Sequence, residues 1–383
     1  MASTRTWLAR IVGFLLVIVL ADAASRWLRI SYWTPFANDR ALAIYVYQRQ
    51  RVPADVLFLG TSKINAAVIP AVIEGELSER LGRPVTAFCL GQPGTNAFTS
   101  WQVLRDVVAS NGSPGVVVLE LSPASLNANH GHIPRDLSSY CSLLDLAGAA
   151  PWIDSPERVV AASAGALRGL TTGTLFATRL FYWESARPRV EAVARKHGAQ
   201  FGPRRRQQQR LSDLTEEQQR QQMRNALPWG RHEYMNRYEI GGAPEAAFRS
   251  ICRLTRDRGI PLVMLDPPVA DRYGRRIATP DETREFQRYL ARAAQTCSFE
   301  RVELDPAALG LTDADFLNLT HLNWDGAATL SRHLATAVLP GLLAPAATAP
   351  AIEESGGGSR ALQEGAPPTP GAEVNLRLVA AFL

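Results

Sequence analysis

The sequence is poor in cysteine and lacks the motifs of several common protein classes. Its 383 residues include only four cysteines, Cys89, Cys141, Cys252 and Cys297. They lie far apart, so no closely spaced pair of the kind that binds zinc is present. A G-x-x-x-x-G-K-[ST] phosphate loop and a credible G-x-G-x-x-G motif are also absent, which argues against a cytoplasmic nucleotide-binding protein. We expect neither a metal nor a cofactor.

A strong excess of charge of either sign is missing as well. Only 20% of the residues are charged, and the net charge of +5 is small for a chain of this length. It is weak support for a nucleic-acid partner, and we expect none. The most basic run, Arg204–Arg210, is typical of a solvated helix face or a flexible segment. As a binding patch it would suit an anionic polysaccharide or a lipid headgroup.

The amino terminus carries a targeting segment over about residues 1–30. Arg5 and Arg10 precede the uninterrupted apolar run Ile11–Leu20, and small residues follow it. The short run and the Ala-x-Ala pattern after it suit a cleaved signal peptide. Counted over residues 7–24, the segment also has about the length that a tilted membrane span needs. Both alternatives place the rest of the chain outside the cytoplasm, either anchored to the membrane and facing the periplasm or secreted.

This location bears on the cysteines. If the compartment is oxidising, Cys252 and Cys297 are the pair that we consider for a disulfide. The spacing of cysteines does not by itself determine their connectivity.

Strand-like and helix-like segments alternate along most of the chain, which predicts β-α-β units and a parallel sheet. The run GVVVLEL is almost continuously apolar, as is typical of a strand in a sheet that is covered on both faces. We therefore expect an α/β domain over residues 39–345, beginning with a linker-like helix at 39–50. The predicted strands are 55–60, 84–90, 115–121, 260–266 and 299–304, and the predicted helices are 66–81, 96–110, 244–258, 279–295 and 325–338.

Two regions depart from this alternation. Between about residues 127 and 242 the pattern becomes helical and irregular, which predicts a helical insertion. Within it, Thr215 and Gln218 fit a capping box at the start of a helix. Residues 346–383 are rich in Ala, Pro, Gly, Ser and Glu and cannot bury enough apolar surface to fold alone, so we expect a disordered tail.

The stretch Val56–Pro70, VLFLGTSKINAAVIP, places a small hydroxyl directly after a predicted buried strand. An apolar run ends at Gly60, the polar turn Thr61-Ser62-Lys63 follows, and a segment with helical apolar spacing comes next. Ser62 is then either a helix N-cap, which accepts hydrogen bonds from free N–H groups, or a nucleophile. The second alternative fits its place at the carboxyl end of a parallel strand, where α/β folds build their sites.

The stretch DADFLNLTHLNWDG contains His321, in a polar loop after the last predicted strand. A single histidine is more often structural than catalytic, but loops at such places commonly carry functional residues. Asn318, Thr320 and Asn323 lie close to it in sequence and can hydrogen-bond with it. A neutral imidazole next to a serine can take the serine proton during attack on an acyl carbon and then return it to the leaving group.

The stretch Leu90–Asn96, LGQPGTN, follows the second predicted strand and contains Gly91 and Gly94. Glycines at this place let backbone N–H groups point into a cavity, as an oxyanion hole requires. An ordinary turn from a strand to a helix would use the same residues, and the stretch by itself fits both alternatives.

Together these stretches resemble the SGNH (GDSL-like) hydrolase superfamily, whose members have a doubly wound, flavodoxin-like three-layer α/β/α domain. FLGTS is similar to the first block of that superfamily, which implies Ser62 as the nucleophile. LGQPGTN is similar to the second block, which implies Gly94 as an oxyanion N–H donor and Gly91 as the glycine of the turn. NLTHLNWDG is similar to the last block, D-x-x-H, which implies His321 as the base.

Two features depart from the superfamily pattern. The third block normally reads G-x-N-D, and its Asn completes the oxyanion hole, but the equivalent stretch here is ELSPAS, followed only later by Asn127 and Asn129. The position three before the histidine is Asn318 instead of Asp. An asparagine can orient an imidazole but cannot stabilise imidazolium by charge, and the same change in a serine protease costs about 10⁴ in turnover. Asp313 and Asp315 are alternatives for the acid, and a Ser–His pair without an acid is the third possibility.

The targeting segment and the stretches ELSP and THLNWDG look most like those of the membrane-anchored branch of this superfamily. That branch includes proteins of alginate O-acetylation and of D-alanyl transfer to teichoic acids. The resemblance covers about residues 55–141 and 242–339. It implies a serine-dependent O-acyltransferase or esterase that modifies an acylated cell-envelope polysaccharide, with the insertion shaping the acceptor groove. Such systems often pair with a multi-spanning membrane acyltransferase that supplies acyl groups. The alternative is an SGNH-like protein of weak or no activity that binds glycans or assists assembly in the envelope.

Overall fold

The computed structural model describes residues 50–133 and 210–343 without interruption, together with short pieces between residues 7 and 48. Most of the predicted targeting segment and of the predicted helix at 39–50, as well as Cys141 and the predicted tail, lie outside the described residues. In the part of the chain that is described, no helix is both long enough and apolar enough to cross a membrane.

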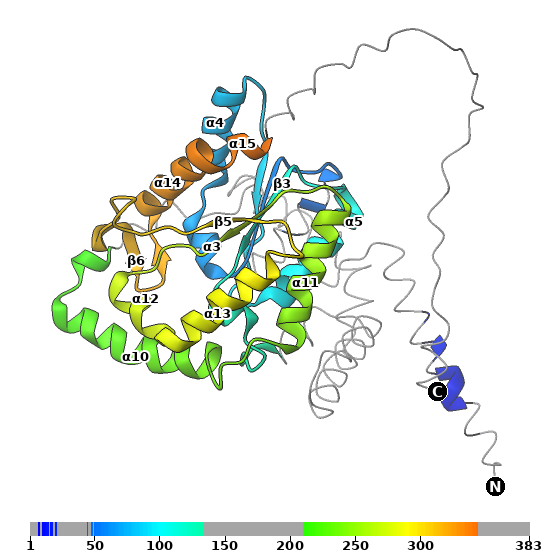
Figure 1. Cartoon of the computed structure of the whole chain (residues 1–383), viewed down its shortest axis with the longest axis horizontal. Helices are drawn as coiled ribbons and strands as arrows, with labels where there is room; N and C mark the ends of the chain where they lie inside the picture. The colour runs from blue at the N-terminus through cyan, green and yellow to red at the C-terminus, as the bar shows by residue number, and fades with distance from the viewer. Residues whose placement is uncertain are drawn as a thin grey trace, which may run out of the picture. The chain divides into compact units, whose positions relative to one another are not determined.

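A sheet of five parallel strands forms the centre of the α/β domain (Figure 1). The strand order is 2-1-3-4-5, and every pair of neighbours is parallel, which confirms the predicted α/β class. In this doubly wound order, a crevice opens at the carboxyl edge between the strands on either side of the reversal, here β1 and β3, and ligands bind in such crevices. The strands are β1 (Val56–Leu59), β2 (Ala87–Cys89), β3 (Val116–Glu120), β4 (Leu262–Leu265) and β5 (Glu300–Val302).

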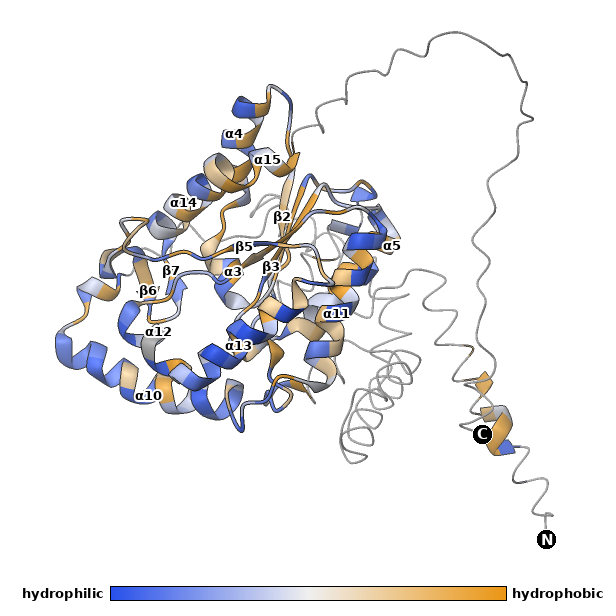
Figure 2. Ribbon diagram, viewed as in Figure 1, coloured by the Kyte–Doolittle hydropathy of each residue, from blue (hydrophilic) through white to orange (hydrophobic). Residues whose placement is uncertain are grey.

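Helices cover both faces of the sheet, because successive side chains of a strand point to opposite faces. Val56 of β1 belongs to one buried cluster with Ile73 and Leu330, and Leu57 belongs to another with Leu104 and Phe248. Figure 2 shows the strands between these helices as strongly hydrophobic. The first face is covered by α3 (Ser62–Ala67), α4 (Pro70–Leu81), α14 (Trp324–His333), the π-helical turn η5 (Leu334–Val338) and α15 (Pro340–Leu343), and the second by α5 (Ala97–Asn111), α11 (Gly242–Asp257) and α13 (Pro280–Ala293).

The segment after β1 folds as two helices, whereas the sequence predicts one over residues 66–81. α3 begins already at Ser62 and ends at Ala67, and α4 begins at Pro70. Proline lacks a backbone N–H and disfavours helical geometry at the residue before it, and Ile69 is accordingly extended, with φ −110° and ψ 99°. The earlier start places Ser62 at the first position of a helix.

Several short elements between β4 and α14 are not predicted by the sequence. They include α12 (Asp271–Ile277), the 3-10 turn η4 (Asp313–Asp315) and an antiparallel pair, β6 (Phe316–Asn318) with β7 (His321–Leu322). The prediction of a loop at His321 is therefore wrong, because this residue begins a short strand. Strands of two or three residues carry too little periodicity to be recognised in a sequence.

Of the predicted helical insertion, the structure describes the two ends. Asn127 forms an isolated antiparallel bridge with Ile240, which brings these ends together. The capping box is confirmed, since the Thr215 hydroxyl accepts the N–H of Gln218 and the Gln218 side chain accepts the N–H of Thr215. The described elements of the insertion are the 3-10 turn η3 (Leu211–Asp213) and the helix α10 (Glu216–Tyr234), and the 3-10 turn η1 (Pro123–Leu126) directly precedes it.

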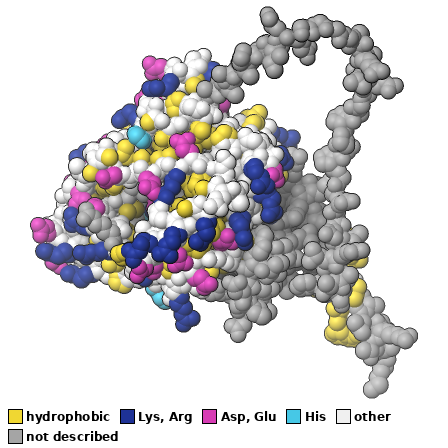
Figure 3. Space-filling view, in the orientation of Figure 1, with side chains coloured by type: hydrophobic (Ala, Val, Ile, Leu, Met, Phe, Trp, Pro, Cys, Tyr) yellow, Lys and Arg dark blue, Asp and Glu magenta, His cyan; other side chains and the backbone are white. Residues whose placement is uncertain are grey.

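The exposed side of α10 carries charges of both signs. Arg224 lies 2.6 Å from Glu217, and Arg220 also pairs with Glu217. Figure 3 shows Lys and Arg side chains with Asp and Glu side chains among them over the region where Figure 1 draws α10 and α13. This mixed charge is typical of a solvated surface.

A disulfide joins Cys252 of α11 to Cys297, which lies shortly before β5. It confirms the pair considered from the sequence. Both residues belong to the buried cluster on the second face of the sheet. Because disulfides persist mainly in oxidising compartments, this bond hints at an extracytoplasmic location.

Candidate active site

Ser62 lies where β1 gives way to α3, at the carboxyl edge of the sheet. Gly60 turns the chain with a φ of 152°, and Thr61 is the N-cap residue of α3. The Thr61 hydroxyl accepts the N–H of Lys63 at 3.1 Å. Thr61 is therefore the N-cap, a role that the sequence left open for Ser62. The Ser62 hydroxyl does not cap this helix.

The Ser62 hydroxyl meets the imidazole of His321. Oγ of Ser62 lies 2.9 Å from Nε2 of His321, although the two residues are 259 positions apart in the chain. The contact arises because α3, which carries the serine, packs against β7, which carries the histidine. At this distance a serine can transfer its proton to an imidazole nitrogen.

Asn318 determines which nitrogen of His321 carries the proton. Its Oδ1 accepts the backbone N–H of Thr320 at 2.9 Å and that of His321 at 3.0 Å. Two donors at one atom identify that atom as the amide oxygen, because an amide nitrogen cannot accept them. Nδ1 of His321 lies 3.0 Å from the same oxygen and 3.0 Å from the Thr320 hydroxyl oxygen, and it donates to the amide oxygen because that oxygen can only accept. Nε2 is then left unprotonated, as the acceptor for the Ser62 hydroxyl.

The two aspartates that the sequence offered as acids have other partners. Asp313 pairs with Arg272 at 2.7 Å. Asp315 accepts the N–H and the hydroxyl of Thr312 at 2.8 and 3.1 Å, and it thereby caps the turn η4. The uncharged Asn318 thus occupies the position next to Nδ1 of the histidine.

The two glycines of LGQPGTN have different roles in the structure. A Cβ on Gly91 would lie 2.7 Å from the carbonyl oxygen of Thr61, so glycine allows this loop to approach the turn that carries Ser62. Gly94 has a left-handed φ of 60°, and its carbonyl oxygen accepts a hydrogen bond from Nδ1 of His132. Gly94 lines the same cavity as Ser62, whereas Gly91 packs behind the turn.

The segment after β3 contributes serines to this cavity instead of an asparagine. Ser122 and Ser125 line the cavity, and their hydroxyl oxygens lie 3.2 Å apart. Asn127 and Asn129 bond backbone groups of residues 234–239 and hold the two ends of the insertion together. Neither of these asparagines is among the described residues that line the cavity.

A buried carboxylate that sequence reasoning missed holds the turn that carries Ser62. Glu120 ends β3, the neighbour of β1, and its Oε2 accepts the N–H of Thr61 at 2.6 Å and that of Ile64 at 3.3 Å. Its Oε1 accepts the Thr61 hydroxyl at 2.8 Å. The strands approach so closely that a Cβ on Gly60 would lie 2.3 Å from Cβ of Glu120. Gly60 is therefore needed for this arrangement.

Lys63 compensates the charge of Glu120. Its Nζ lies 3.3 Å from Oε1 of Glu120 and 2.8 Å from Oδ1 of Asp266, which follows β4. Burial disfavours the ammonium form, but the carboxylates of Asp266 and Glu120 outweigh burial and raise the pKa of Lys63 above its ordinary value of 10.5. The ends of β1, β3 and β4 are thus joined by one network of charges. The only trace of it in the sequence is a charged residue within four positions of the end of each of these apolar strands.

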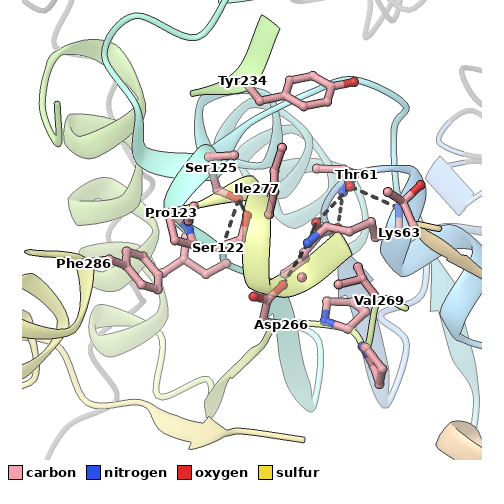
Figure 4. Close-up of a pocket in the computed structure, with 18 of the residues that line it drawn as sticks. Thr61, Lys63, Ser122, Pro123, Ser125, Tyr234, Asp266, Val269, Ile277 and Phe286 are labelled. Atoms are coloured by element: carbon pink, nitrogen blue, oxygen red, sulfur yellow. Dashed lines mark hydrogen bonds and ion pairs between the residues drawn. The ribbon is translucent and has the colours of Figure 1, made fainter. Parts of the chain in front are cut away.

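The Ser62–His321 pair opens into a cavity of about 1190 Å³ at the carboxyl edge of the sheet. Its walls come from the ends of β1, β3 and β4 and from α10, α12 and α13. Figure 4 shows Lys63 and Asp266 linked on one side, and Ile277 and Phe286 among the apolar side chains. The volume exceeds the range of about 300–1,000 Å³ that is common for small-molecule sites.

The fold and the site define an α/β domain that carries a Ser–His pair in a large cavity at the edge of its parallel sheet. No protein-family model matches the chain, and no curated protein matches it. Among the described residues, no group of three or more His, Cys, Asp and Glu side chains is arranged to hold a metal ion.

Proposed function

We propose that this protein is an extracytoplasmic, serine-dependent O-acyltransferase or esterase that acts on an acylated cell-envelope glycan. The observation that carries the proposal is the distance of 2.9 Å between Oγ of Ser62 and Nε2 of His321, at the edge of a large cavity. The resemblance to SGNH hydrolases assigns the same two residues as nucleophile and base. The strand order 2-1-3-4-5 agrees with the flavodoxin-like domain of that superfamily.

In the first half-reaction, Ser62 attacks the acyl carbonyl carbon of the donor ester, and its hydroxyl proton passes to Nε2 of His321. The backbone N–H groups of Ser62 and Gly94 hold the oxyanion of the tetrahedral intermediate. The bond between the acyl carbon and the donor oxygen then breaks, and His321 gives the proton to that oxygen. The products are the free donor alcohol and an acyl ester on Ser62.

In the second half-reaction, an acceptor hydroxyl gives its proton to His321 and attacks the acyl ester. The bond from the acyl carbon to Oγ breaks, and Ser62 recovers the proton. A sugar hydroxyl as acceptor makes the reaction a transfer, and water makes it a hydrolysis. Asn318 supports both steps, because it keeps the resting proton on Nδ1 and leaves Nε2 basic.

The glycan substrate and the location rest on different observations. The disulfide between Cys252 and Cys297 and the apolar run near the amino terminus both support a site outside the cytoplasm. The resemblance to the membrane-anchored SGNH branch supports an envelope glycan as acceptor. It also supports a multi-spanning membrane acyltransferase as the partner that supplies acyl groups.

A second candidate function is a glycan-binding or assembly protein of weak or no activity. It is favoured by the uncharged Asn318 next to the histidine and by the positions of Asn127 and Asn129, which bond backbone groups of residues 234–239. The contact between Ser62 and His321 opposes it, because a binding protein has no need of an accepting imidazole nitrogen at a serine hydroxyl.

Turnover of p-nitrophenyl acetate by the purified full-length chain separates the two functions. We expect Ser62→Ala to abolish release of p-nitrophenol and His321→Ala to slow it by about 10²–10⁴-fold. Ser212→Ala is the matched control, because Ser212 is exposed on η3 and is not among the described residues that line the cavity. Turnover that is equal in the wild type and in Ser62→Ala would contradict the proposed enzyme and favour the binding protein.

A further inference from the structure

The cavity next to Ser62 has large apolar walls that the proposed reaction does not itself require. Val269 lies between β4 and α12, Ile277 ends α12, and Phe286 projects from α13. Pro123 closes the opposite side from the turn η1. Figure 4 draws Ile277 between the turn that carries Thr61 and Lys63 and the pair Pro123 and Phe286. An acetyl group would leave most of a cavity of about 1190 Å³ unused.

Three hydroxyl groups in the same wall, those of Ser122, Ser125 and Thr95, already have hydrogen-bond partners. The hydroxyls of Ser122 and Ser125 lie 3.2 Å apart, and the Ser125 hydroxyl also accepts the N–H of Ser122. The Thr95 hydroxyl donates to the carbonyl oxygen of Gln92 at 2.7 Å. A sugar ring needs hydrogen-bond partners for its hydroxyls when it leaves water, whereas a hydrocarbon chain needs none. Internally paired polar groups therefore favour a hydrocarbon occupant.

The charges at the cavity wall also oppose an ionic occupant. Lys63 is held between the carboxylates of Glu120 and Asp266, at 3.3 and 2.8 Å. An anionic headgroup would have to displace one of these carboxylates, and a cation would meet the ammonium group. The Lys63 network is thus electrically balanced. Arg284 and Arg301 also line the cavity, and they pair with Asp281 and Glu303.

We propose that this cavity binds the hydrocarbon chain of the acyl donor, and that the acyl group is a medium-length fatty acyl chain instead of acetyl. This inference rests on the proposed function, because the chain enters the cavity from the acyl carbon that bonds to Oγ of Ser62. The apolar side chains Val269, Ile277, Phe286 and Pro123 then shield the chain from water. The polar acceptor approaches the ester from the open side of the cavity.

A series of p-nitrophenyl esters with two, four, six and eight acyl carbons tests this inference on the full-length chain. The assay uses one detergent-free buffer for all four esters, because detergent or lipid chains would compete for the same cavity. Each added methylene that is buried should raise kcat/KM about fourfold, which corresponds to about 0.8 kcal/mol. Values of kcat/KM that are flat or fall from acetate to octanoate would overturn the inference and leave the proposed esterase intact.

A variant that narrows the cavity provides a second test. Ala124 is a small, partly exposed residue of η1 that lines the cavity, and Ala124→Phe adds a ring to the space for the chain. We expect this variant to lower kcat/KM for octanoate at least tenfold and to lower kcat/KM for acetate much less. Ala71→Phe, on the exposed side of α4, is the matched control and should alter neither value. Equal losses for acetate and octanoate in Ala124→Phe would contradict a chain-binding cavity.

Binding of octanamide, measured by calorimetry, separates this inference from the proposed function. Octanamide binding that is much tighter than acetamide binding, and that Ala124→Phe weakens, supports the chain-binding cavity even if no ester is turned over. In that case the acyltransferase proposal fails while the cavity assignment stands. Octanamide binding no tighter than acetamide binding would overturn the inference, whatever the esterase activity.

Discussion

At the scale of single residues, the chemistry of the site depends on how the Asn318 amide hydrogen-bonds with His321. In a serine protease, replacing the aspartate of the triad by asparagine disables the enzyme because the histidine is held in the wrong tautomer. Here two backbone N–H groups fix the amide so that its oxygen faces Nδ1. The tautomer is therefore the productive one, and only the charge that would stabilise imidazolium is missing.

The variant Asn318→Asp tests whether the missing negative charge next to His321 limits the rate. A carboxylate oxygen can accept the same donors and adds the missing charge, so we expect kcat to rise by about 10- to 100-fold. The carboxylate also favours the imidazolium form, so the acid limb of the kcat/KM profile should move to higher pH.

Asn318→Ala provides the opposite change and should lower kcat, because Nδ1 loses its amide acceptor and keeps only the Thr320 hydroxyl, which can also donate to it and so favour the other tautomer. The pH–rate profiles of both variants, with p-nitrophenyl acetate, are the measurement. A folded Asn318→Asp variant that is no faster than the wild type would show that charge at this position is irrelevant.

At the scale of elements, the ends of three neighbouring strands build the turn that presents Ser62. Glu120 at the end of β3 accepts two backbone N–H groups and one hydroxyl from this turn, and Lys63 joins the network to Asp266 beyond β4. A buried carboxylate of this kind stabilises the fold only if its partners stay in place. Because these partners flank Ser62 on both sides, the network holds the backbone turn from which the Ser62 side chain projects.

Glu120→Gln should reduce kcat about 10- to 100-fold with little change in KM. The amide must place an NH₂ group against either the N–H of Thr61 or the ammonium of Lys63, which displaces the turn, and a shift of about 1 Å near a nucleophile can cost about 10² in rate. The measurement is the rate of the acylation burst per folded molecule, so that a loss of stability alone does not lower it. The exposed Glu79→Gln on α4 is the control. A Glu120→Gln variant with full burst rate and a lower melting temperature would restrict Glu120 to a structural role.

At the scale of the whole molecule, the parallel sheet was predictable because its strands have strong local signals. VLFL and VVVLE are continuous apolar runs, and each predicted strand overlaps an observed one. The break before Pro70 and the short pair β6 and β7 were missed, because their limits depend on contacts with distant parts of the chain.

The site was predictable only in part, because several of its contacts also join distant parts of the chain. Ser62, His321 and Gly94 follow from a resemblance in short stretches, and the structure brings all three to one cavity. The contacts of Glu120 with the turn depend on β3 being the neighbour of β1, which no local pattern reveals. The orientation of Asn318 likewise depends on backbone geometry that residue identity does not specify.

The disulfide also acts on the molecule as a whole, because it links α11 to the segment before β5, and its two cysteines are 45 positions apart. Replacing both Cys252 and Cys297 by serine should lower the stability by about 2–4 kcal/mol, and the melting temperature by roughly 5–15 °C. The turnover of p-nitrophenyl acetate at 25 °C should not change, because neither cysteine lines the cavity.

Differential scanning calorimetry with and without a reductant is the measurement for the disulfide. The reductant should lower the melting temperature of the wild type and leave that of the double variant unaltered. A wild type that is insensitive to reductant under conditions that reduce the bond would contradict a stabilising role.

The central claim is that Ser62 is acylated, and the mass of the intact protein tests it most directly. The full-length chain is mixed with p-nitrophenyl acetate, quenched in acid and weighed by mass spectrometry beside Ser62→Ala and His321→Ala. We predict an acetyl adduct that maps to Ser62, that is absent in Ser62→Ala and that forms more slowly in His321→Ala. A folded wild-type protein that forms no adduct, or an adduct that persists in Ser62→Ala, would contradict the account.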